Sequence, residues 1–166
     1  MSAVYAIVGF IVVERLAELA FAARNARRML ARGAVESGAR HYPLFIVLHA
    51  AWLVDLVLRV PADTAVNLPL LAAFAALQGV RLWVIMSLGE RWTTRVIVPP
   101  GEPPVTKGPY RYMKHPNYAV VVAEIAVVPL MFGAWATAAL FSLLNLALLR
   151  HRIRVEEAAL AAPRRG

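Results

Sequence analysis

The apolar stretch from Tyr118 to Leu149 is the feature that most restricts how this chain can fold. A straight helix of about 32 residues would be nearly 50 Å long, whereas the hydrocarbon core of a bilayer is only about 30 Å thick. The stretch is therefore too long for a single crossing. Pro129 and Gly133 near its middle favour a turn, so the stretch predicts a helical hairpin.

Other apolar runs long enough to cross a bilayer recur along the chain. Of its 166 residues, 60% are hydrophobic and 17% are charged, and the mean hydropathy is +0.61. A soluble core of this size could not bury so much apolar surface. We therefore interpret residues 1–166 as a single membrane-embedded domain with an all-α fold, in preference to a soluble helical bundle.

The basic residues are clustered. Fifteen of the 18 Lys and Arg lie in three groups of five, within residues 24–40, 91–114 and 150–165. A net charge of +8 could suggest a nucleic-acid partner, but this placement is typical of the cytoplasmic loops of membrane proteins. The turns around Asp63 and at 132–135 contain no Lys or Arg. We expect no nucleic-acid binding, an N-terminus outside and a C-terminus in the cytoplasm.

Counting from this pattern gives about five transmembrane helices. They are expected at Ser2–Ala23, Leu44–Val60 and Leu68–Leu88, followed by the two arms of the hairpin. Because those arms are short, the last helix should continue past Leu149 to about Leu160. No cleavable signal peptide is expected, since no basic segment or cleavage site precedes the first helix. The absence of cysteine excludes disulfides and thiolate metal sites.

The segment between Arg91 and Pro116 loses helical periodicity. Residues 95–98 are typical of an extended strand, the proline-rich residues 99–104 of a rigid turn, and residues 105–110 of a second extended piece. Together they could form a small hairpin on the membrane surface. A solvated linker with a basic belt that touches anionic lipid explains the same residues.

Two motifs on either side of the apolar hairpin resemble a known family. TKGPYRYMKHPNY and the later RIRVEE are similar to the signature of the isoprenylcysteine carboxyl methyltransferases, integral membrane enzymes that use S-adenosylmethionine. The family pattern, approximately Arg-His-Pro-x-Tyr-x-Gly and a distant Glu-Glu pair, falls on the positions that follow: Lys114, His115, Pro116, Tyr118, Val120, Glu156 and Glu157. Val120 stands where the family has Gly, and the chain ends in AAPRRG where relatives continue with an aromatic segment.

The first half of the chain resembles a bacterial branch of this family. Some members of that branch lie beside type III polyketide synthases and O-methylate long-chain pyrones or phenolic lipids. The resemblance implies a lipophilic acceptor, either such a lipid or a prenylcysteine-type carboxylate, at a bacterial plasma membrane. The active site, built from residues 88–118 and 150–166, would face the cytoplasm.

The resemblance implies a binding site for S-adenosylmethionine near both motifs. The expected cofactor-binding residues are Lys107, Gly108, Tyr110, His115, Pro116, Tyr118, Glu156 and Glu157. Carboxylates suit the polar groups of this molecule, and aromatic faces favour its sulfonium. Arg152, one helical turn before Glu156, is expected to orient that acid or to face an acceptor anion as a catalytic residue. Taken alone, the acidic pair could equally be a solvated helix end, and His115 an interfacial histidine.

Polar groups within the apolar segments are candidates for the acceptor site. Glu124 is a catalytic candidate because an intramembrane acid is expected to be functional. The expected substrate-binding residues are His49 and Trp52, which are three apart on the second predicted helix and could face one cavity, with Glu36, His41 and Tyr42 at its cytoplasmic mouth. Glu14, Arg15 and Glu18 are expected to neutralise one another as a structural group. No metal site is expected, because the four histidines lack ligand-like spacing.

Three other functions fit part of the same pattern. A phospholipid amine N-methyltransferase would differ only in its acceptor atom, and an NADPH-dependent membrane reductase would share the C-terminal motif. The acidic pair suits a phosphate-rich cofactor poorly, which disfavours the reductase. A non-catalytic lipid-binding protein would bind membrane lipid but no cofactor. The sequence gives no prediction of the oligomeric state.

Overall fold

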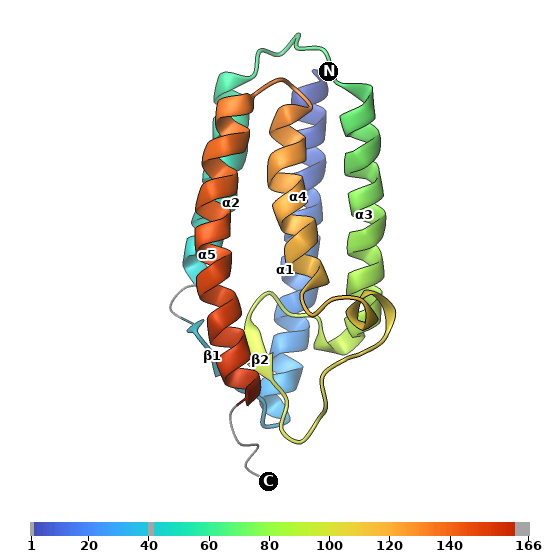
Figure 1. The fold of residues 1–166 in the computed structure, drawn as a ribbon, viewed down its shortest axis with the longest axis vertical. Coiled ribbons are helices and arrows are strands. Elements are labelled where there is room, and N and C mark those ends of the chain that lie inside the picture. Colours follow the sequence, from blue (N-terminus) through green and yellow to red (C-terminus); the bar gives the residue numbers. More distant parts are fainter. Residues whose placement is uncertain (1, 40–41, 162–166) are drawn as a thin grey trace.

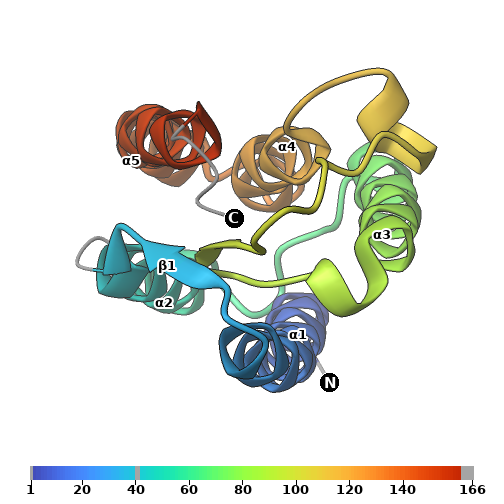
Figure 2. The same cartoon turned by 90° about the horizontal axis from the view of Figure 1, so that it is seen from below.

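The chain forms a bundle of helices that stand side by side (Figure 1). The structure is a computed structural model that describes residues 2–39 and 42–161. Within these residues the five α-helices are α1 (Ala3–Ala31), α2 (Tyr42–Arg59), α3 (Leu68–Leu88), α4 (Pro116–Leu130) and α5 (Trp135–Ala161). The shorter elements are strands β1 (Val35–Ser37) and β2 (Val96–Val98) and 3-10 helices η2 (Gly89–Arg91) and η3 (Gly108–Arg111). These short elements gather at one end of the bundle (Figures 1 and 2).

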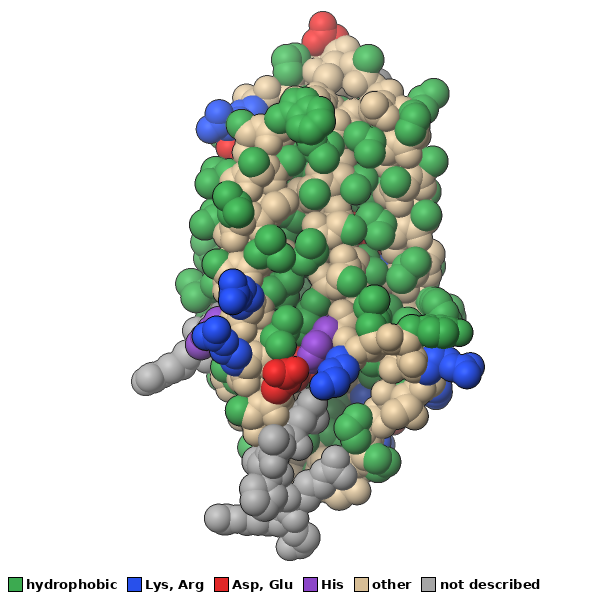
Figure 3. Space-filling view, viewed as in Figure 1, with side chains coloured by type: hydrophobic (Ala, Val, Ile, Leu, Met, Phe, Trp, Pro, Cys, Tyr) green, Lys and Arg blue, Asp and Glu red, His purple; other side chains and the backbone are tan. Residues whose placement is uncertain are grey.

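Within the described residues, two helical segments are long and apolar enough to cross a membrane. They are Tyr42–Arg59 and Leu68–Arg91, and Pro116–Leu130 is a shorter apolar helix. Hydrophobic side chains cover the middle of the face in Figure 3, and most charged side chains on that face lie toward the end of the bundle that carries β1 and β2. This distribution is consistent with a helical membrane protein.

The helix boundaries agree with the sequence pattern in most places. Helix α3 has the predicted bounds: Asn67 caps its start by accepting a hydrogen bond from the Leu70 amide, and Gly89 with φ +54° ends it. The predicted hairpin is confirmed, with a turn between α4 and α5 at Gly133, where φ is +71°. The continuation of the last helix past Leu149 is also confirmed.

Helix α1 is longer than predicted. The sequence suggested an end at Ala23, but the helix continues to Ala31. The added turns are anchored by Asn25, which is buried and donates hydrogen bonds to the carbonyl oxygens of Gly89 and Trp92. The basic residues in these added turns are exposed to solvent. Hydropathy alone therefore predicted a loop at this position.

The strand pairing differs from the predicted hairpin. β2 is extended as expected, but it pairs antiparallel with β1, with Val35 opposite Val98 and Ser37 opposite Val96. The second piece of the predicted hairpin instead contains η3. The backbone groups of β2 can form hydrogen bonds with any nearby extended segment. Because α1 is longer than predicted, β1, which follows it, lies beside β2.

The apolar core lies between all five helices. It includes Val8 of α1, Trp52 and Leu56 of α2, Phe74 of α3, Val128 of α4 and Phe141 of α5. A second, smaller cluster of Ala22, Val84 and Trp92 packs η2 against α1 and α3. The core therefore fills one end of the bundle, and the elements at the other end are held partly by polar contacts.

A polar cluster bridges α1, α3 and α4 within the bundle. Arg81 of α3 is 1% exposed and pairs with Glu124 of α4 and Glu18 of α1. Arg15 pairs with Glu14, Glu18 and Glu124. The predicted mutual neutralisation within α1 is thus confirmed, and the structure extends it to two further helices. We name the group of Glu14, Arg15, Glu18, Arg81 and Glu124 the buried ion cluster.

Gly108 permits a close contact between η3 and α3. Its φ is +59°, and a Cβ atom placed there would lie 2.1 Å from Oγ of Ser87 and 3.3 Å from Nε1 of Trp83. A side chain at this position is excluded both by backbone strain and by collision. The glycine therefore fixes how the segment before α4 lies on α3.

Replacing Arg81 by Met should destabilise the protein strongly. The change leaves buried carboxylates without their main partner, which typically costs about 3–5 kcal/mol. The melting temperature in detergent should fall by roughly 10 °C. Arg59→Met is the matched control, because Arg59 is exposed and pairs with Asp55 on its own helix, and an exposed pair contributes at most about 1 kcal/mol. Equal melting temperatures for the two variants would contradict a stabilising role of the cluster.

Gly108→Ala should destabilise the protein more than Gly101→Ala. Both glycines have positive φ, at +59° and +70°, but a Cβ atom at Gly101 would meet nothing within 4 Å. The control thus carries only the backbone penalty, about 1–3 kcal/mol, while Gly108→Ala adds the collision with Ser87. Thermal unfolding of the two variants measures the difference, and similar losses would show that the contact with α3 is not tight.

Candidate functional site

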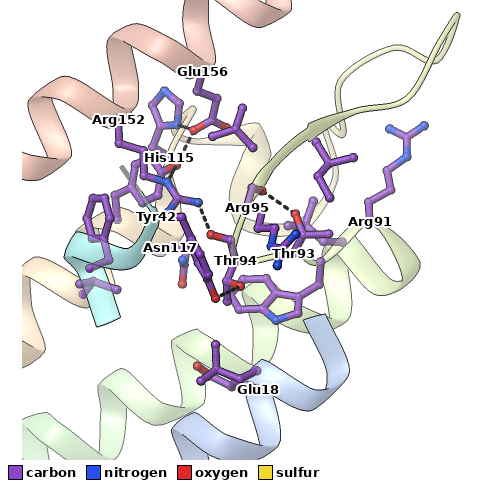
Figure 4. Close-up of a pocket in the computed structure, with 18 of the residues that line it drawn as sticks. Glu18, Tyr42, Arg91, Thr93, Thr94, Arg95, His115, Asn117, Arg152 and Glu156 are labelled. Atoms are coloured by element: carbon purple, nitrogen blue, oxygen red, sulfur yellow. Dashed lines mark hydrogen bonds and ion pairs between the residues drawn. The ribbon is translucent and has the colours of Figure 1, made fainter. Parts of the chain in front are cut away.

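A cavity of about 1040 Å³ lies at the end of the bundle that carries the short elements. All five helices and β2 contribute to its lining. The polar residues of its lining include Arg15, Glu18, Tyr42, His49, Arg81, Thr94, Tyr110, His115, Asn117, Tyr118, Arg152, Glu156 and Glu157. Figure 4 shows His115 and Glu156 at one end of this cavity and Glu18 at the other.

A chain of polar contacts connects the start of α4 to the end of α5. Tyr118 donates a hydrogen bond to Glu156, and Nε of Arg152 donates to the Tyr118 hydroxyl oxygen at 2.8 Å. Pro116 at the first position of α4 fixes the helix start. Arg152 and Glu156 are one turn apart on α5. Arg152 therefore orients Glu156 through Tyr118 rather than directly.

His115 packs against this chain. Its ring stacks on Tyr118, with 5.1 Å between ring centroids and 13° between planes. Its Nδ1 lies 3.8 Å from Glu156, and its Nε2 lies 4.0 Å from Glu157. The predicted grouping of His115, Tyr118 and the acidic pair is therefore present in the fold, where residues about 40 positions apart in sequence meet.

Arg152 is held by neutral groups. The side chain is 9% exposed and donates to the carbonyl oxygen of Thr94 at 2.7 Å. Its guanidinium lies over the rings of Phe45 and Tyr118, 5.2 and 5.4 Å from their centroids. Among the described residues, no carboxylate forms an ion pair with it. Its charge is therefore available to a ligand anion in the cavity.

Tyr110 borders the same cavity in its neutral form. Burial raises the pKa of its hydroxyl well above the usual range, and the nearby Glu156 carboxylate adds to this rise. The hydroxyl therefore stays protonated at physiological pH and can donate a hydrogen bond.

Three buried polar atoms of the lining have no hydrogen-bond partner within the described residues. They are Nε2 of His115, Oδ1 of Asn117 and Nε1 of Trp92. A buried unpaired polar atom costs free energy, so such atoms indicate a missing partner such as a ligand. With the acidic pair and the aromatic faces close by, the lining offers what S-adenosylmethionine requires: acids for its amine or ribose, polar atoms for its remaining groups and aromatic walls. The residues therefore fit this molecule.

Several predicted site residues lie elsewhere. Those outside the lining of the cavity are Glu36, Trp52, Lys107, Gly108, Pro116 and Glu124. Glu36 pairs with Arg95 at 3.3 Å, and Lys107 borders a second, smaller cavity. The expectation that Trp52 faces the same cavity as His49 is wrong, because Trp52 is buried in the apolar core and only touches His49 edge-on. His41 lies outside the described residues.

Three residues donate hydrogen bonds to the carboxylate of Glu124. Gln78 and Arg81 donate to Oε1, and Arg15 and Arg81 donate to Oε2. Both carboxylate oxygens are thereby engaged by side chains of neighbouring helices, and Glu124 does not line the main cavity. The geometry favours a structural role for Glu124 over the predicted catalytic one.

The structure adds residues that the motifs did not single out. Asn117 lies between Pro116 and Tyr118 of the motif, and its position there was the available signal. Thr94 contributes a backbone carbonyl and, through Oγ1, a contact of 2.9 Å to the Tyr42 hydroxyl. A contact through a backbone carbonyl cannot be predicted from the residue type, because every residue has this group. Within the described residues no group of His, Asp or Glu side chains is arranged to hold a metal ion.

Comparison with known proteins adds an independent line of information. The chain is 40% identical over 158 residues to YpbQ, an uncharacterized protein of Bacillus subtilis, a match that covers 93% of this chain and 94% of YpbQ. It is 24% identical over 155 residues to an uncharacterized protein of Haemophilus influenzae, covering 89% and 88% of the two chains. No solved structure matches.

Residues 70–162 match the model of the isoprenylcysteine carboxyl methyltransferase (ICMT) family. The match contains η3, α4, α5 and the whole polar chain from His115 to Glu157. The resemblance based on the two motifs is therefore confirmed. The protein belongs to the isoprenylcysteine carboxyl methyltransferase family, which implies a membrane methyltransferase.

Proposed function

We propose that this protein transfers a methyl group from S-adenosylmethionine to an oxygen of a lipophilic acceptor. The observation that carries the proposal is the polar chain of Arg152, Tyr118 and Glu156 beside unpaired buried atoms of His115 and Asn117. This polar end opens into a cavity whose other walls are largely apolar. One cavity thus offers places for a polar cofactor and an oily acceptor.

The residues of the polar end would hold S-adenosylmethionine in a fixed orientation. Glu156 and Glu157 would accept hydrogen bonds from its amine or ribose hydroxyls, and Arg152 would pair with its carboxylate. When bound, S-adenosylmethionine supplies an electrophilic methyl group on a positively charged sulfur. The role of the protein is mainly to align the acceptor oxygen with that methyl group and to exclude water.

Two apolar stripes would hold the chain of the acceptor. Val12, Leu16 and Leu19 of α1 and Ile46, Ala50 and Leu53 of α2 all border the cavity. Each stripe has the spacing of one helix face. Leu16 is 61% exposed and Ile46 is 47% exposed, so neither side chain is enclosed in the apolar core. An acyl or prenyl chain would enter here from the bilayer and gain about 0.8 kcal/mol per buried methylene.

The proposed setting is a bacterial plasma membrane, crossed by all five helices. The end that carries β1, β2 and the C-terminal part of α5 would face the cytoplasm, because the clusters of Lys and Arg gather there. Helix α1 with 29 residues and α5 with 27 would cross the membrane and project beyond it. The whole chain would act as one domain.

An N-methyltransferase that acts on phospholipid amines is the nearest alternative. An amine acceptor is cationic in solution and would favour free carboxylates at the acceptor end. Glu18, the acid that borders the cavity there, is already paired with both Arg15 and Arg81. This pairing favours an oxygen acceptor.

Glu156→Gln should weaken binding of S-adenosylhomocysteine by about 10- to 100-fold, the effect of losing a hydrogen bond to a charged group. Isothermal titration of the detergent-solubilised protein measures it. Glu90→Gln is the matched control, because Glu90 carries the same charge at the same end but pairs with Arg28 and Arg32 outside the main cavity. Equal affinities for the two variants would remove the acidic pair from the site. If the wild type binds NADPH in preference to S-adenosylhomocysteine, the proposed function would be that of a reductase and not of a methyltransferase.

Single cysteines should reveal the orientation, since the natural chain contains none. Cysteines at Arg32, Glu102 and Ala158 should react with a membrane-impermeant maleimide only in inverted vesicles, and one at Asp63 only in intact cells. All four positions are exposed. Labelling of Asp63→Cys from the same side as the other three would overturn the five-span arrangement.

A further inference from the structure

The state of the His49 ring is fixed by one hydrogen bond. Its Nδ1 lies 2.8 Å from the carbonyl oxygen of Phe45, one turn earlier on α2. A carbonyl oxygen can only accept a hydrogen bond, so Nδ1 carries the hydrogen. In the neutral imidazole, Nε2 then has a lone pair and no hydrogen. The ring also meets Trp52 edge-on, with 6.4 Å between centroids and 81° between planes. The orientation of the ring is thereby held from two sides.

His49 borders the main cavity close to the proposed reaction centre. Phe45, whose carbonyl binds Nδ1, has its ring under the guanidinium of Arg152. His49 is one turn, about 6 Å, further along α2 toward the apolar end. No described residue forms a hydrogen bond or ion pair with Nε2. The lone pair is thus the available proton acceptor between the polar end of the cavity and the apolar stripes.

The charges around His49 disfavour a carboxylate in the same place. The buried ion cluster contributes Arg15, Glu18 and Arg81 to the lining, and each of these guanidiniums already pairs with at least two carboxylates. With three acids and two bases, the cluster has a formal charge of −1 when every group is ionised. Arg152 would already be paired with the carboxylate of the cofactor, so a carboxylate acceptor beside the cluster would add a second negative charge without a partner in a low-dielectric setting. A proton gained by His49 would instead offset the existing charge.

We infer that His49 is the general base for an acceptor with an acidic hydroxyl, such as a phenol or an enol, and that this enzyme does not methylate a carboxylate. The inference rests on the proposed methyltransferase function and narrows its substrate class. The O–H bond breaks as its proton passes to Nε2. The oxygen's electron pair forms the bond to the methyl carbon, while the pair of the broken carbon–sulfur bond stays on sulfur. The positive charge thus passes from sulfur to the imidazole, and no further reactant is needed.

A coloured acceptor analogue tests the proton transfer without any cofactor. A 2-alkyl-4-nitrophenol is titrated with protein in detergent at a pH where the free probe is mostly un-ionised. The wild type should shift the bound probe to its yellow nitrophenolate, because Nε2 takes the proton. His49→Gln should bind the probe without the colour change, since Gln can still donate to the Phe45 carbonyl but cannot accept a proton. His151→Gln is the matched control and should behave as the wild type, because His151 lies outside the cavity.

Turnover supplies the second readout. With S-adenosylmethionine and a long-chain alkylphenol, His49→Gln should lose about 10²- to 10⁴-fold in kcat, and added imidazole should restore part of the loss. An alkylphenol acidic enough to be ionised in solution should lose far less. A benzoate with the same alkyl chain should be a poor acceptor for the wild type.

The outcomes separate the two proposals. If the wild type binds S-adenosylhomocysteine and methylates the phenol, but His49→Gln keeps its colour change and its turnover, the role of His49 is wrong and the methyltransferase stands. Faster methylation of the benzoate than of the phenol would overturn the substrate class. If the wild type binds no S-adenosylhomocysteine, both proposals fail.

Unchanged S-adenosylhomocysteine affinity shows that a variant is folded. If His49→Gln does not fold, it is replaced by His49→Phe, which keeps a ring against Trp52.

Discussion

The pairing of Arg81 with Glu124 and Glu18 is the interaction on which the interior of this bundle depends. It places a guanidinium that is 1% exposed between α1, α3 and α4. Apolar packing is a weak guide to helix register in lipid, because lipid tails are as apolar as leucine. A charge in such a setting accepts few arrangements, since leaving it unpaired costs several kcal/mol. The cluster therefore specifies how these three helices lie relative to one another.

The candidate site depends on that arrangement. Tyr118 is on α4, less than two turns before Glu124, so the pairing of Glu124 with Arg81 also sets where Tyr118 lies. Helix α5 continues beyond the apolar core and brings Arg152 and Glu156 to the Tyr118 hydroxyl. The loop after η2 closes the group through the Thr94 carbonyl. Polar contacts thus connect the interior of the bundle to the cavity in which the chemistry is proposed.

The two ends of the cavity suit different parts of a methyl transfer. At one end, Arg152, His115 and the acidic pair surround space for a charged cofactor. At the other, stripes of α1 and α2 line the cavity with apolar side chains. A polar cofactor would occupy the charged end of the cavity, and a lipophilic acceptor would occupy the apolar end. The lone pair of His49 lies between them, where an acceptor hydroxyl would lose its proton.

Much of the site could be predicted because its residues lie in short motifs with fixed local geometry. The fixed φ of Pro116 suits the first position of a helix, and Arg152 and Glu156, four residues apart, share one helix face. The expectations for Trp52 and Glu36 were less successful. A helix presents several faces, and the choice of which face meets the cavity depends on neighbours that are distant in sequence. His49 and Trp52 are neighbours on α2, yet the surrounding helices leave His49 at the cavity and enclose Trp52 in the apolar core.

The sequence by itself determined the order of the helices, the hairpin at Gly133 and the family, since hydropathy, turn residues and motif spacing are local properties. Only the tertiary structure decided that β1 pairs with β2, that Glu124 is enclosed by Arg15, Gln78 and Arg81, and that Nε2 of His49 has an unshared lone pair. Each of these depends on which partner lies within hydrogen-bond distance. The sequence does not distinguish a Glu or His whose acceptor atoms are all hydrogen-bonded from one that can still accept a proton. The distinction is set by three-dimensional contacts, and it is the one that separates a structural residue from a reactive one.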